Sequence, residues 1–221
     1  MFDDIVTRYD LLNDVLSVGF DRWWRRRAAA SVTAPPGSPI LDIGCGTGRL
    51  GERLVRTHPV MGVDISHAML VEARARRDAR MQLVQGSAFR LPFGDETFAG
   101  AVSGFVLRNL DDLPAAFAEL ARVLRHGAVA ALLDITEPAS PTRRRAFDSY
   151  FRVAAPALGS LVGKRDAYRY LVGSLAHLPS RQEVCGQLER AGFRDARARG
   201  LAPGMVTLWT AKRANPLMQD G

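Results

Sequence analysis

Short apolar segments alternate along this chain with segments whose apolar residues recur every three or four positions. The apolar segments that predict strands lie at 39–43, 60–63, 81–84, 98–104 and 129–135. The helical patterns between them lie at 50–57, 66–80 and 111–127. Strands joined by single helices are typical of βαβ units, which form parallel sheets. The pattern therefore predicts an α/β fold with a doubly wound, mostly parallel sheet.

Capping residues mark the boundaries of the later elements. Asp112 is expected to cap one helix, which we expect Gly127 to end. Ser180 and Glu183 form a capping box for another helix, which ends near Gly192. Two further strands are expected at 196–200 and 205–211. The predicted sheet then has seven strands and the Rossmann-like order of a nucleoside-binding fold.

Two stretches, 1–38 and 136–179, do not follow the alternation. Both are helical in pattern and rich in aromatic residues. On a doubly wound fold, additions of this kind usually cover the ligand crevice at the carboxyl ends of the strands. A chain of 221 residues is long enough for one sizeable core. We therefore expect residues 1–221 to form a single domain, with 1–38 as a helical lid and 136–179 as a helical insertion that covers a substrate.

The most informative segment for chemistry is 41–48, which reads LDIGCGTG. Glycines at 44, 46 and 48 allow a sharp turn between strand and helix, and let the backbone approach a ligand closely. A dinucleotide-binding turn would need glycine at 49, where this chain has Arg49. The observed spacing instead favours the turn of a methyltransferase that uses S-adenosylmethionine.

Asp64 supports the same interpretation. It ends the second expected strand, 20 residues after Gly44. A carboxylate at that strand end can accept hydrogen bonds from both ribose hydroxyls of a nucleoside. Its alternative role, capping the next helix, is already supplied by Ser66.

The other cofactor contacts are assigned from their places at strand ends. Ser87 and Ala88 are expected beside the adenine, with a plain turn as the alternative, and Gly104 beside the methionine portion. The residues assigned to S-adenosylmethionine are Asp42, Gly44, Cys45, Gly46, Thr47, Asp64, Ile65, Ser87, Ala88 and Gly104. A sulfonium is already electrophilic, so we expect an aligned nucleophile in a dry pocket and no metal.

The charge and the cysteines bear on the partners. The net charge is +7, and arginines gather at 22–27, beside two tryptophans, and at 143–145. Such clusters indicate either an anionic membrane surface or ordinary solvated helix faces. The chain has no nucleic-acid motif, so we expect no nucleic-acid partner. Two distant cysteines, without a signal peptide or a spanning apolar run, predict a cytoplasmic protein with peripheral membrane contact as an addition.

Three segments resemble the ubiquinone/menaquinone biosynthesis C-methyltransferases. Residues 1–17 look like that family's amino-terminal signature. Phe105-Val106-Leu107-Arg108-Asn109 resembles its F-G-L-R-N segment, and Tyr168-Arg169-Tyr170-Leu171 with Ser174 resembles its Y-R-Y-L-x-x-S run. The likeness covers nearly the whole chain.

The resemblance implies methylation of a ring carbon on a demethylated prenyl quinol. By the same resemblance, Arg108, Asn109 and Tyr9 are the candidate catalytic residues, and Asn13, Phe105, Tyr168 and Tyr170 the candidate substrate-binding residues. Arginine is too basic to accept the hydroxyl proton, so we expect Arg108 to act electrostatically. A surface arginine is the alternative for Arg108, and simple packing is the alternative for each tyrosine.

The sequence also departs from the family pattern, most clearly at Val106, where the family has glycine. These departures concern the acceptor rather than the cofactor turn. The alternatives are therefore a methyltransferase for another small aromatic or polyketide-like metabolite, and a non-catalytic protein that binds S-adenosylmethionine. RNA methylation is disfavoured because the aromatic lid suits an apolar ring. The oligomeric state stays open, with a homodimer among the alternatives.

Overall fold

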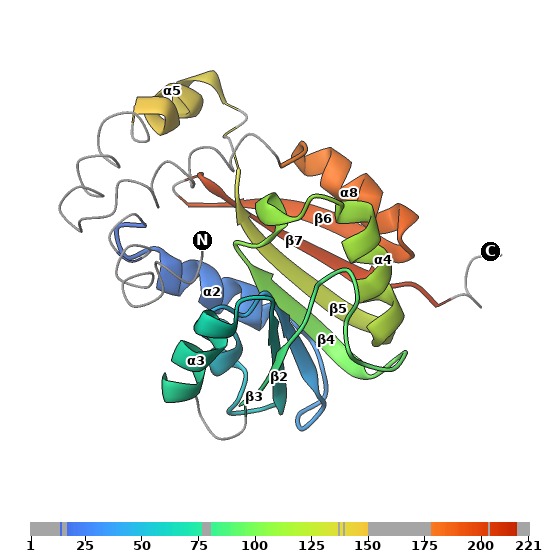
Figure 1. The fold of residues 1–221 in the computed structure, drawn as a ribbon. Helices are drawn as coiled ribbons and strands as arrows, with labels where there is room; N and C mark the ends of the chain where they lie inside the picture. Colours follow the sequence, from blue (N-terminus) through green and yellow to red (C-terminus); the bar gives the residue numbers. More distant parts are fainter. Residues whose placement is uncertain are drawn as a thin grey trace.

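The computed structural model describes residues 14, 17–76, 81–136, 138, 140–149, 178–202 and 204–215. These ranges contain one seven-stranded sheet, with strand order β3-β2-β1-β4-β5-β7-β6. The strands are β1 (Ile40–Ile43), β2 (Val60–Asp64), β3 (Met81–Gln85), β4 (Phe98–Gly104), β5 (Leu124–Ile135), β6 (Phe193–Leu201) and β7 (Val206–Arg213). Figure 1 shows how the sheet forms the middle of the molecule. The predicted seven-stranded, Rossmann-like fold is confirmed.

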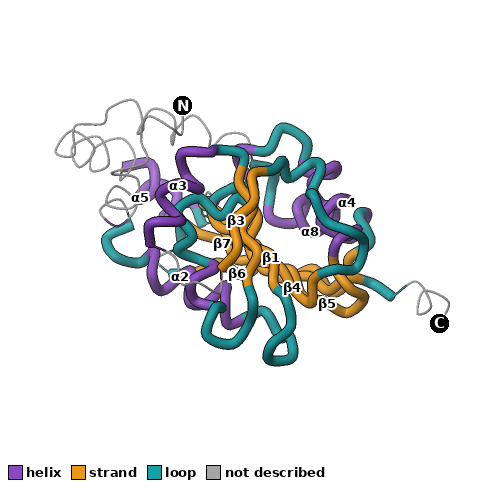
Figure 2. Tube along the Cα trace, turned by 60° about the horizontal axis from the view of Figure 1, so that its bottom comes forward, coloured by secondary structure: helices purple, strands orange, loops and turns teal. Residues whose placement is uncertain are grey.

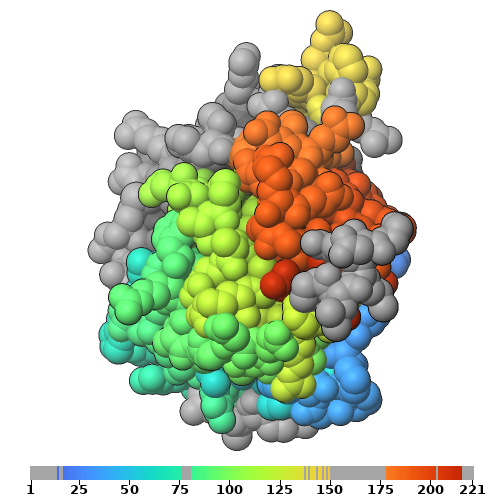
Figure 3. All heavy atoms as spheres, turned by 90° about the vertical axis from the view of Figure 1, so that its right-hand side faces the viewer, coloured from blue at the N-terminus to red at the C-terminus, as the bar shows by residue number. Residues whose placement is uncertain are grey.

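Helices cover both faces of the sheet. The helices are α2 (Asp21–Ala30), α3 (His67–Arg76), α4 (Leu113–Val123), α5 (Pro141–Ser149) and α8 (Arg181–Arg190). Figure 2 shows α2 and α3 on one side of the strands and α4 and α8 on the other. In Figure 3, α4 (yellow-green) and α8 (orange) form the surface of the second face. One apolar cluster lies under α4 and α8, and a second lies under α2 and α3.

The five strands β1 to β5 run parallel, so their carboxyl ends meet at one edge of the sheet. Topology changes direction between β1 and β4, because the chain first builds outward to β3 and then returns. A ligand crevice is expected at such a switch point. β7 runs antiparallel between β5 and β6, and β6 forms the edge of the sheet opposite β3.

The helix expected at 50–57 is wrong. The structure has a single 3-10 turn there, η2 (Gly51–Arg53), followed by further turns. The Gly51 amide donates to the carboxylate of Asp42 at 2.8 Å, and Leu54 and Thr57 donate to carbonyls three residues back. Bonds of this kind, mixed with single four-residue bonds from Glu52 N and His58 N, form turns rather than a continuous α-helix.

The end expected for the helix after Asp112 is also wrong. Asp112 caps α4, as predicted, through Ala115 N at 2.9 Å. The helix ends at Val123, however, and β5 begins at the next residue. Gly127, with φ +80°, lies within β5, where the pairing with β4 shifts register. The glycine therefore shapes an irregularity in the strand rather than the end of the helix.

The strand expected at 129–135 begins five residues earlier, at Leu124, and the other expected strands lie within three residues of their predicted bounds. Ser66 caps α3, and Ser180 caps α8 by accepting the Glu183 amide at 3.2 Å. Residues 77–80, the end of the helix expected at 66–80, lie outside the described residues. Most of the insertion expected at 136–179 also lies outside them, apart from α5 and a few neighbouring positions.

Candidate active site

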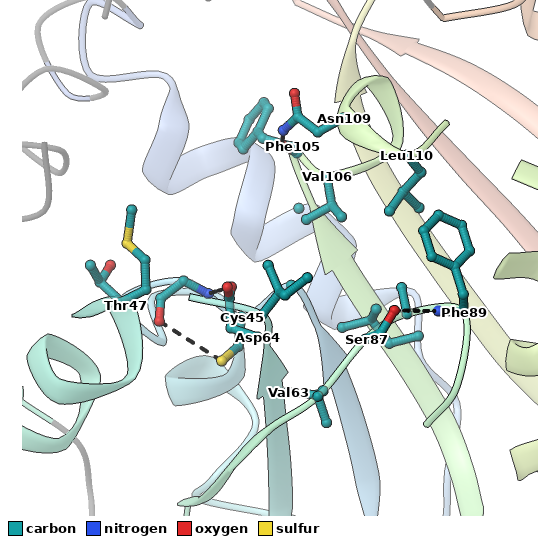
Figure 4. Close-up of a pocket in the computed structure, with 18 of the residues that line it drawn as sticks. Cys45, Thr47, Val63, Asp64, Ser87, Phe89, Phe105, Val106, Asn109 and Leu110 are labelled. Atoms are coloured by element: carbon teal, nitrogen blue, oxygen red, sulfur yellow. Dashed lines mark hydrogen bonds between the residues drawn. The ribbon is translucent and has the colours of Figure 1, made fainter. Parts of the chain in front are cut away.

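A cavity of about 260 Å³ opens at the carboxyl edge of β1, β2, β3 and β4. Figure 4 shows Thr47, Cys45 and Asp64 on one side of it, Ser87 and Phe89 on another, and Phe105 with Asn109 at a third. The residues come from five separate stretches of sequence. The position is the one expected from the switch point between β1 and β4.

The glycine turn after β1 forms one wall of the cavity. Gly44 and Gly46 have φ of +61° and +54°, which a glycine adopts without strain. The Val106 side chain packs so closely over Gly44 that a Cβ there would clash with it. The turn is tied to β2 because Cys45 N donates to Val63 O at 3.0 Å. Thr47 lines the same wall.

Asp64 lies at the end of β2 and faces this turn. Its Oδ2 accepts the Gly46 amide at 2.8 Å, and its Oδ1 accepts the Ser66 amide at 2.9 Å. Each carboxylate oxygen has a second lone pair, and the carboxylate lines the cavity. This geometry fits a nucleoside whose two ribose hydroxyls donate to the carboxylate. Asp64 therefore both fixes the turn and offers the expected acceptors.

Asp42 occupies a different place from the one assigned to it. It does not line the cavity but lies behind the turn, where its Oδ2 accepts the Gly51 amide. Among the described residues, its Oδ1 has no hydrogen-bond donor. Burial raises the pKa of this carboxyl group to about 7, against the opposing effects of the Gly51 hydrogen bond and the charge of Arg25. The position indicates support of the turn.

The wall at β3 fits an adenine ring. Ser87 and Ala88 line it, and the Ser87 hydroxyl accepts the Phe89 amide at 3.2 Å, which places it in a local turn. The side chains of Ile65 and Phe89 are 68% and 41% exposed although both are apolar. They offer surfaces against which a flat ring can be packed out of water.

The wall at β4 holds the segment expected to face the acceptor. Phe105 has φ +66°, an uncommon conformation for a large side chain. Its amide is held by Leu133 O on β5, and its carbonyl accepts Asn109 Nδ2 at 3.4 Å. Phe105, Val106 and Asn109 all line the cavity, in the short stretch that includes η3 (Leu107–Asn109).

Arg108 is not among the residues that line the cavity. Its guanidinium pairs with the carboxylate of Asp134, which is fully buried near the end of β5. The same carboxylate accepts the Arg108 and Ile135 amides. The guanidinium also lies 5.9 Å from the centre of the Phe105 ring. Arg108 is therefore not a surface arginine, and it holds the wall on which Phe105 and Asn109 lie.

Arg25 lines the cavity and was not identified from the sequence, where it lies within the basic cluster at 22–27. The spacing of Asp21 and Arg25, four residues apart on a helix, is the one signal that could have marked it. The other cavity-lining residues missed by the sequence analysis are Ile43, Val63, Met69, Gly86, Phe89, Leu110 and Asp111.

Tyr9, Asn13, Tyr168 and Tyr170, which the sequence analysis assigned to catalysis or to the acceptor, lie outside the described residues. Within the described ranges, no group of three or more His, Cys, Asp or Glu side chains is arranged to hold a metal ion. Cys45 is among the residues that line the cavity, and burial raises the pKa of its thiol well above the ordinary value, with a further contribution from Asp42.

The fold and this cavity define the class of protein: a Rossmann-like methyltransferase that uses S-adenosylmethionine. A SAM-dependent methyltransferase of Thermotoga maritima has the same fold, with TM-score 0.67 and 20% identity over 96% of this chain and 97% of that one. A phosphoethanolamine N-methyltransferase of Haemonchus contortus in complex with S-adenosyl-L-methionine also shares it, with TM-score 0.67 and 14% identity over 97% and 60% of the two chains.

The chain belongs to the ubiE/COQ5 methyltransferase family, whose model matches residues 1–213. It is 35% identical to a demethylmenaquinone methyltransferase of Desulfitobacterium hafniense, over 96% of this chain and 88% of that protein. It is 36% identical to a ubiquinone/menaquinone biosynthesis C-methyltransferase of Syntrophotalea carbinolica, over 98% and 94% of the two chains. The family resemblance and the use of S-adenosylmethionine, both predicted from the sequence, are confirmed.

Proposed function

We propose that this protein transfers a methyl group to a ring carbon of a demethylated prenyl quinol. The observation that carries the proposal is the single cavity in which the glycine turn and Asp64 meet Phe105 and Asn109. The names of the two relatives point to the same class of acceptor. One wall of this cavity suits a nucleoside cofactor and another suits a flat apolar ring. The cavity can therefore hold the two partners between which a methyl group is transferred.

The reaction needs a carbon nucleophile, which a deprotonated quinol hydroxyl creates by moving electron density onto the adjacent ring carbon. S-adenosylmethionine supplies the electrophilic methyl group when bound. Asn109 is the polar side chain that the η3 stretch brings to this wall, and its carboxamide would polarise the hydroxyl or a water beside it. Phe105 and Val106 would hold the ring and exclude water, which strengthens that polarisation.

Arg108 would act through this wall rather than as a proton acceptor. Its pairing with Asp134 fixes the backbone that carries Asn109 and Phe105. Its guanidinium also lies 5.9 Å from the centre of the Phe105 ring, a cation–π distance that helps to hold this ring in place. Tyr9, Asn13, Tyr168 and Tyr170 complete the acceptor site in this proposal, by their resemblance to the family segments.

The same proposal treats residues 1–221 as a single domain with two covers, 1–38 and 136–179. Within the first, α2 brings Arg25 to the cavity wall. Within the second, α5 follows β5 at the carboxyl edge of the sheet, where Figure 1 shows it beyond the strand ends. Both described parts therefore lie on the side from which an acceptor would enter.

A methyl-transfer assay tests the proposal, with labelled S-adenosylmethionine and a short-chain demethylmenaquinone reduced by dithionite. We expect turnover by the wild type and a loss of about 100-fold in Asn109→Ala, because one positioned polar group contributes about that factor. Arg108→Lys should lose less turnover than Asn109→Ala, since lysine keeps a positive charge beside Asp134. The matched control is Arg194→Ala, an exposed arginine on β6.

Val106 favours a second acceptor class. Its side chain lies in the cavity where the similar family segment has glycine, so it narrows the acceptor wall. If the wild type binds S-adenosylhomocysteine but leaves the quinol untouched, the quinol proposal fails, and another small aromatic metabolite becomes the acceptor to screen. If Val106→Gly then methylates the quinol, the valine side chain is the reason why the wild type does not.

We also propose that α2 brings the protein to an anionic membrane surface, where prenyl quinols reside. Trp24 and Arg25, which the sequence analysis included in this contact, point inward; Trp24 is 4% exposed and its Nε1 donates to Ala202 O at 2.7 Å. Arg22 and Arg26 are the exposed arginines of α2 that line a groove between α2 and η2. The groove arginines are Arg22, Arg26, Arg49, Arg53 and Arg56. No helix in the described ranges is long and apolar enough to span a membrane.

Crowded positive charge supports this role for the groove. Burial, followed by the charges of Arg26 and Arg25, lowers the pKa of Arg53. Just before α2 in the sequence, Val18 and Phe20 expose apolar side chains. Arginines beside exposed apolar residues are the combination that binds a membrane interface.

Co-sedimentation with vesicles tests the membrane contact. We expect binding to vesicles that contain phosphatidylglycerol and little binding to pure phosphatidylcholine. Arg22→Glu with Arg26→Glu should weaken binding at least about tenfold, since each basic residue near the surface contributes about 1 kcal/mol. Arg197→Glu with Arg199→Glu on β6 makes the same charge change at the far edge of the sheet. Equal binding to both vesicles would exclude the contact.

A further inference from the structure

One arginine of α2 turns inward and reaches the cavity. Arg25 is 6% exposed, and it lines the cavity beside Gly104 and Phe105. A Cβ on Gly104 would lie 3.2 Å from Arg25 Nη1, so the guanidinium lies directly over the end of β4. Its Cζ is 5.0 Å from the centre of the Phe105 ring. The guanidinium is thus fixed between the ends of the cofactor wall and the acceptor wall.

Asp21 binds the Arg25 guanidinium through its Nε only. Arg25 Nε donates to both Asp21 oxygens, at 2.9 and 3.0 Å, and Asp21 is itself buried. Asp21 is shared with Arg49, whose Nη1 lies 3.4 Å from Oδ2. Asp14 in turn pairs with Arg49 at 2.8 Å. Within the described residues, the two Nη groups of Arg25 have no hydrogen-bond acceptor, and they lie on the cavity side of this chain of charges.

The cofactor has one group that matches these donors. If its ribose is held by Asp64, its methionine portion would lie along the glycine turn, on the side of the cavity that Gly104 lines. That tail ends in a carboxylate, which is costly to bury without a positive partner. Arg25 is the cationic side chain among the described residues that line the cavity. Its planar, preorientated guanidinium suits a carboxylate better than a flexible lysine would.

We propose that Arg25 binds the α-carboxylate of the methionine portion and selects ligands that retain it. Asp21 is the positioning residue that orients the guanidinium. The inference rests on the cofactor part of the proposed function and does not depend on the identity of the acceptor. It gives one member of the basic cluster at 22–27 a role distinct from that of its exposed neighbours.

Isothermal titration with two ligands tests the proposal: S-adenosylmethionine, and its decarboxylated form, which keeps the sulfonium and the amine. Wild type should bind the decarboxylated ligand roughly 10- to 100-fold more weakly, the range expected for loss of a charge-assisted hydrogen bond. Arg25→Met should weaken S-adenosylmethionine by a similar factor and should leave the decarboxylated ligand within about twofold. The non-additivity of the two changes isolates the contact itself.

The controls separate the ways in which the proposal can fail. Arg26→Met removes an exposed arginine from the same helix and should bind both ligands as the wild type does. If Arg25→Met weakens both ligands equally, Arg25 serves only the packing of α2 and the proposal is wrong. If Arg25→Met does not fold, the wild-type comparison decides alone, and equal affinities overturn the proposal. Failure of the wild type to bind either ligand would instead reject the cofactor site.

Discussion

At the carboxyl edge of the sheet, Asp42 on β1 and Asp134 on β5 each place a buried carboxylate behind a turn of the cavity. Asp134 accepts the amide of Arg108 and that of its neighbour Ile135, and it pairs with the guanidinium of Arg108. Asp42 accepts one amide, from Gly51, and burial raises its pKa to about 7. The acceptor side therefore compensates a buried charge with an opposite charge, whereas the cofactor side favours the neutral acid.

This difference predicts how the stability of each wall responds to mutation and to pH. A buried ion pair contributes little net stability while intact, but the loss of one partner leaves an uncompensated charge. An unpaired buried carboxyl group responds to pH instead, because it folds most favourably when protonated. The acceptor wall should thus be sensitive to mutation, and the cofactor wall to pH.

The largest expected effect is on the acceptor wall. Asp134→Ala should lower the free energy of unfolding by about 3–5 kcal/mol, because it removes the carboxylate that compensates the charge of the buried Arg108 guanidinium. Urea unfolding at pH 7 measures this change. Asp95→Ala is the matched control, since Asp95 pairs with Arg122 at the surface, at 2.7 Å, and its loss should cost less than about 1 kcal/mol. A cost for Asp134→Ala no larger than that of the control would contradict the comparison.

The second effect is the pH dependence that Asp42 imposes. The unfolded carboxyl group ionises near 3.8 and the folded one near 7, so its stabilising contribution is fully present below the unfolded pKa. This contribution is lost as the pH rises toward 7 and is constant above it. At about 1.4 kcal/mol for each pKa unit, the loss is on the order of 4 kcal/mol.

Asp42→Asn should remove this slope, since an amide cannot ionise and can still accept the Gly51 hydrogen bond. Urea unfolding at several values between pH 4 and pH 8 would show the variant gaining stability relative to the wild type as the pH rises. Glu189→Gln, at an exposed position on α8, is the control and should track the wild type. A constant difference between Asp42→Asn and wild type across this range would mean that Asp42 is ionised throughout.

The two walls also differ in how far the sequence predicts them. The glycine turn and Asp64 were predicted because each function lies in a short contiguous segment, at the end of a strand that its apolar pattern marks. The acceptor segment 105–109 was found only by its family resemblance. Its support from Asp134 depends on a pairing between β4 and β5, and a contact across 26 residues has no local signal.

Arg25 on α2 is a second residue whose role could not be predicted from the sequence. The sequence presents six basic or tryptophan residues in a row at 22–27, and helical periodicity alone does not say which of them turns inward. That choice is made by Trp24, which packs against Phe105 and bonds to Ala202, and by Asp21, which pairs with Arg25. The wrong prediction of a helix at 50–57 also reflects a contact outside the segment, because the buried carboxylate of Asp42 binds the Gly51 amide.

The smallest expected effect lies at the junction of the two walls, where Val106 packs over Gly44. Gly44→Ala should be destabilised for two reasons, the φ of +61° and the clash with the Val106 side chain. Gly46→Ala separates them, because its φ is +54° but no atom lies within 4 Å of its added Cβ. We expect Gly46→Ala to lower the free energy of unfolding by about 1 kcal/mol, and Gly44→Ala to lower it by about 1–3 kcal/mol more.

Val106→Gly, the residue of the similar family segment, should relieve only the steric part. In the Gly44→Ala background it should therefore return the stability to about that of Gly46→Ala in thermal unfolding, whereas in the wild-type background it should destabilise by loss of packing. Titration with S-adenosylhomocysteine should follow the same order, because the contact lies on the cofactor turn. If Val106→Gly rescues neither quantity, the two walls are independent, and Val106 constrains only the acceptor.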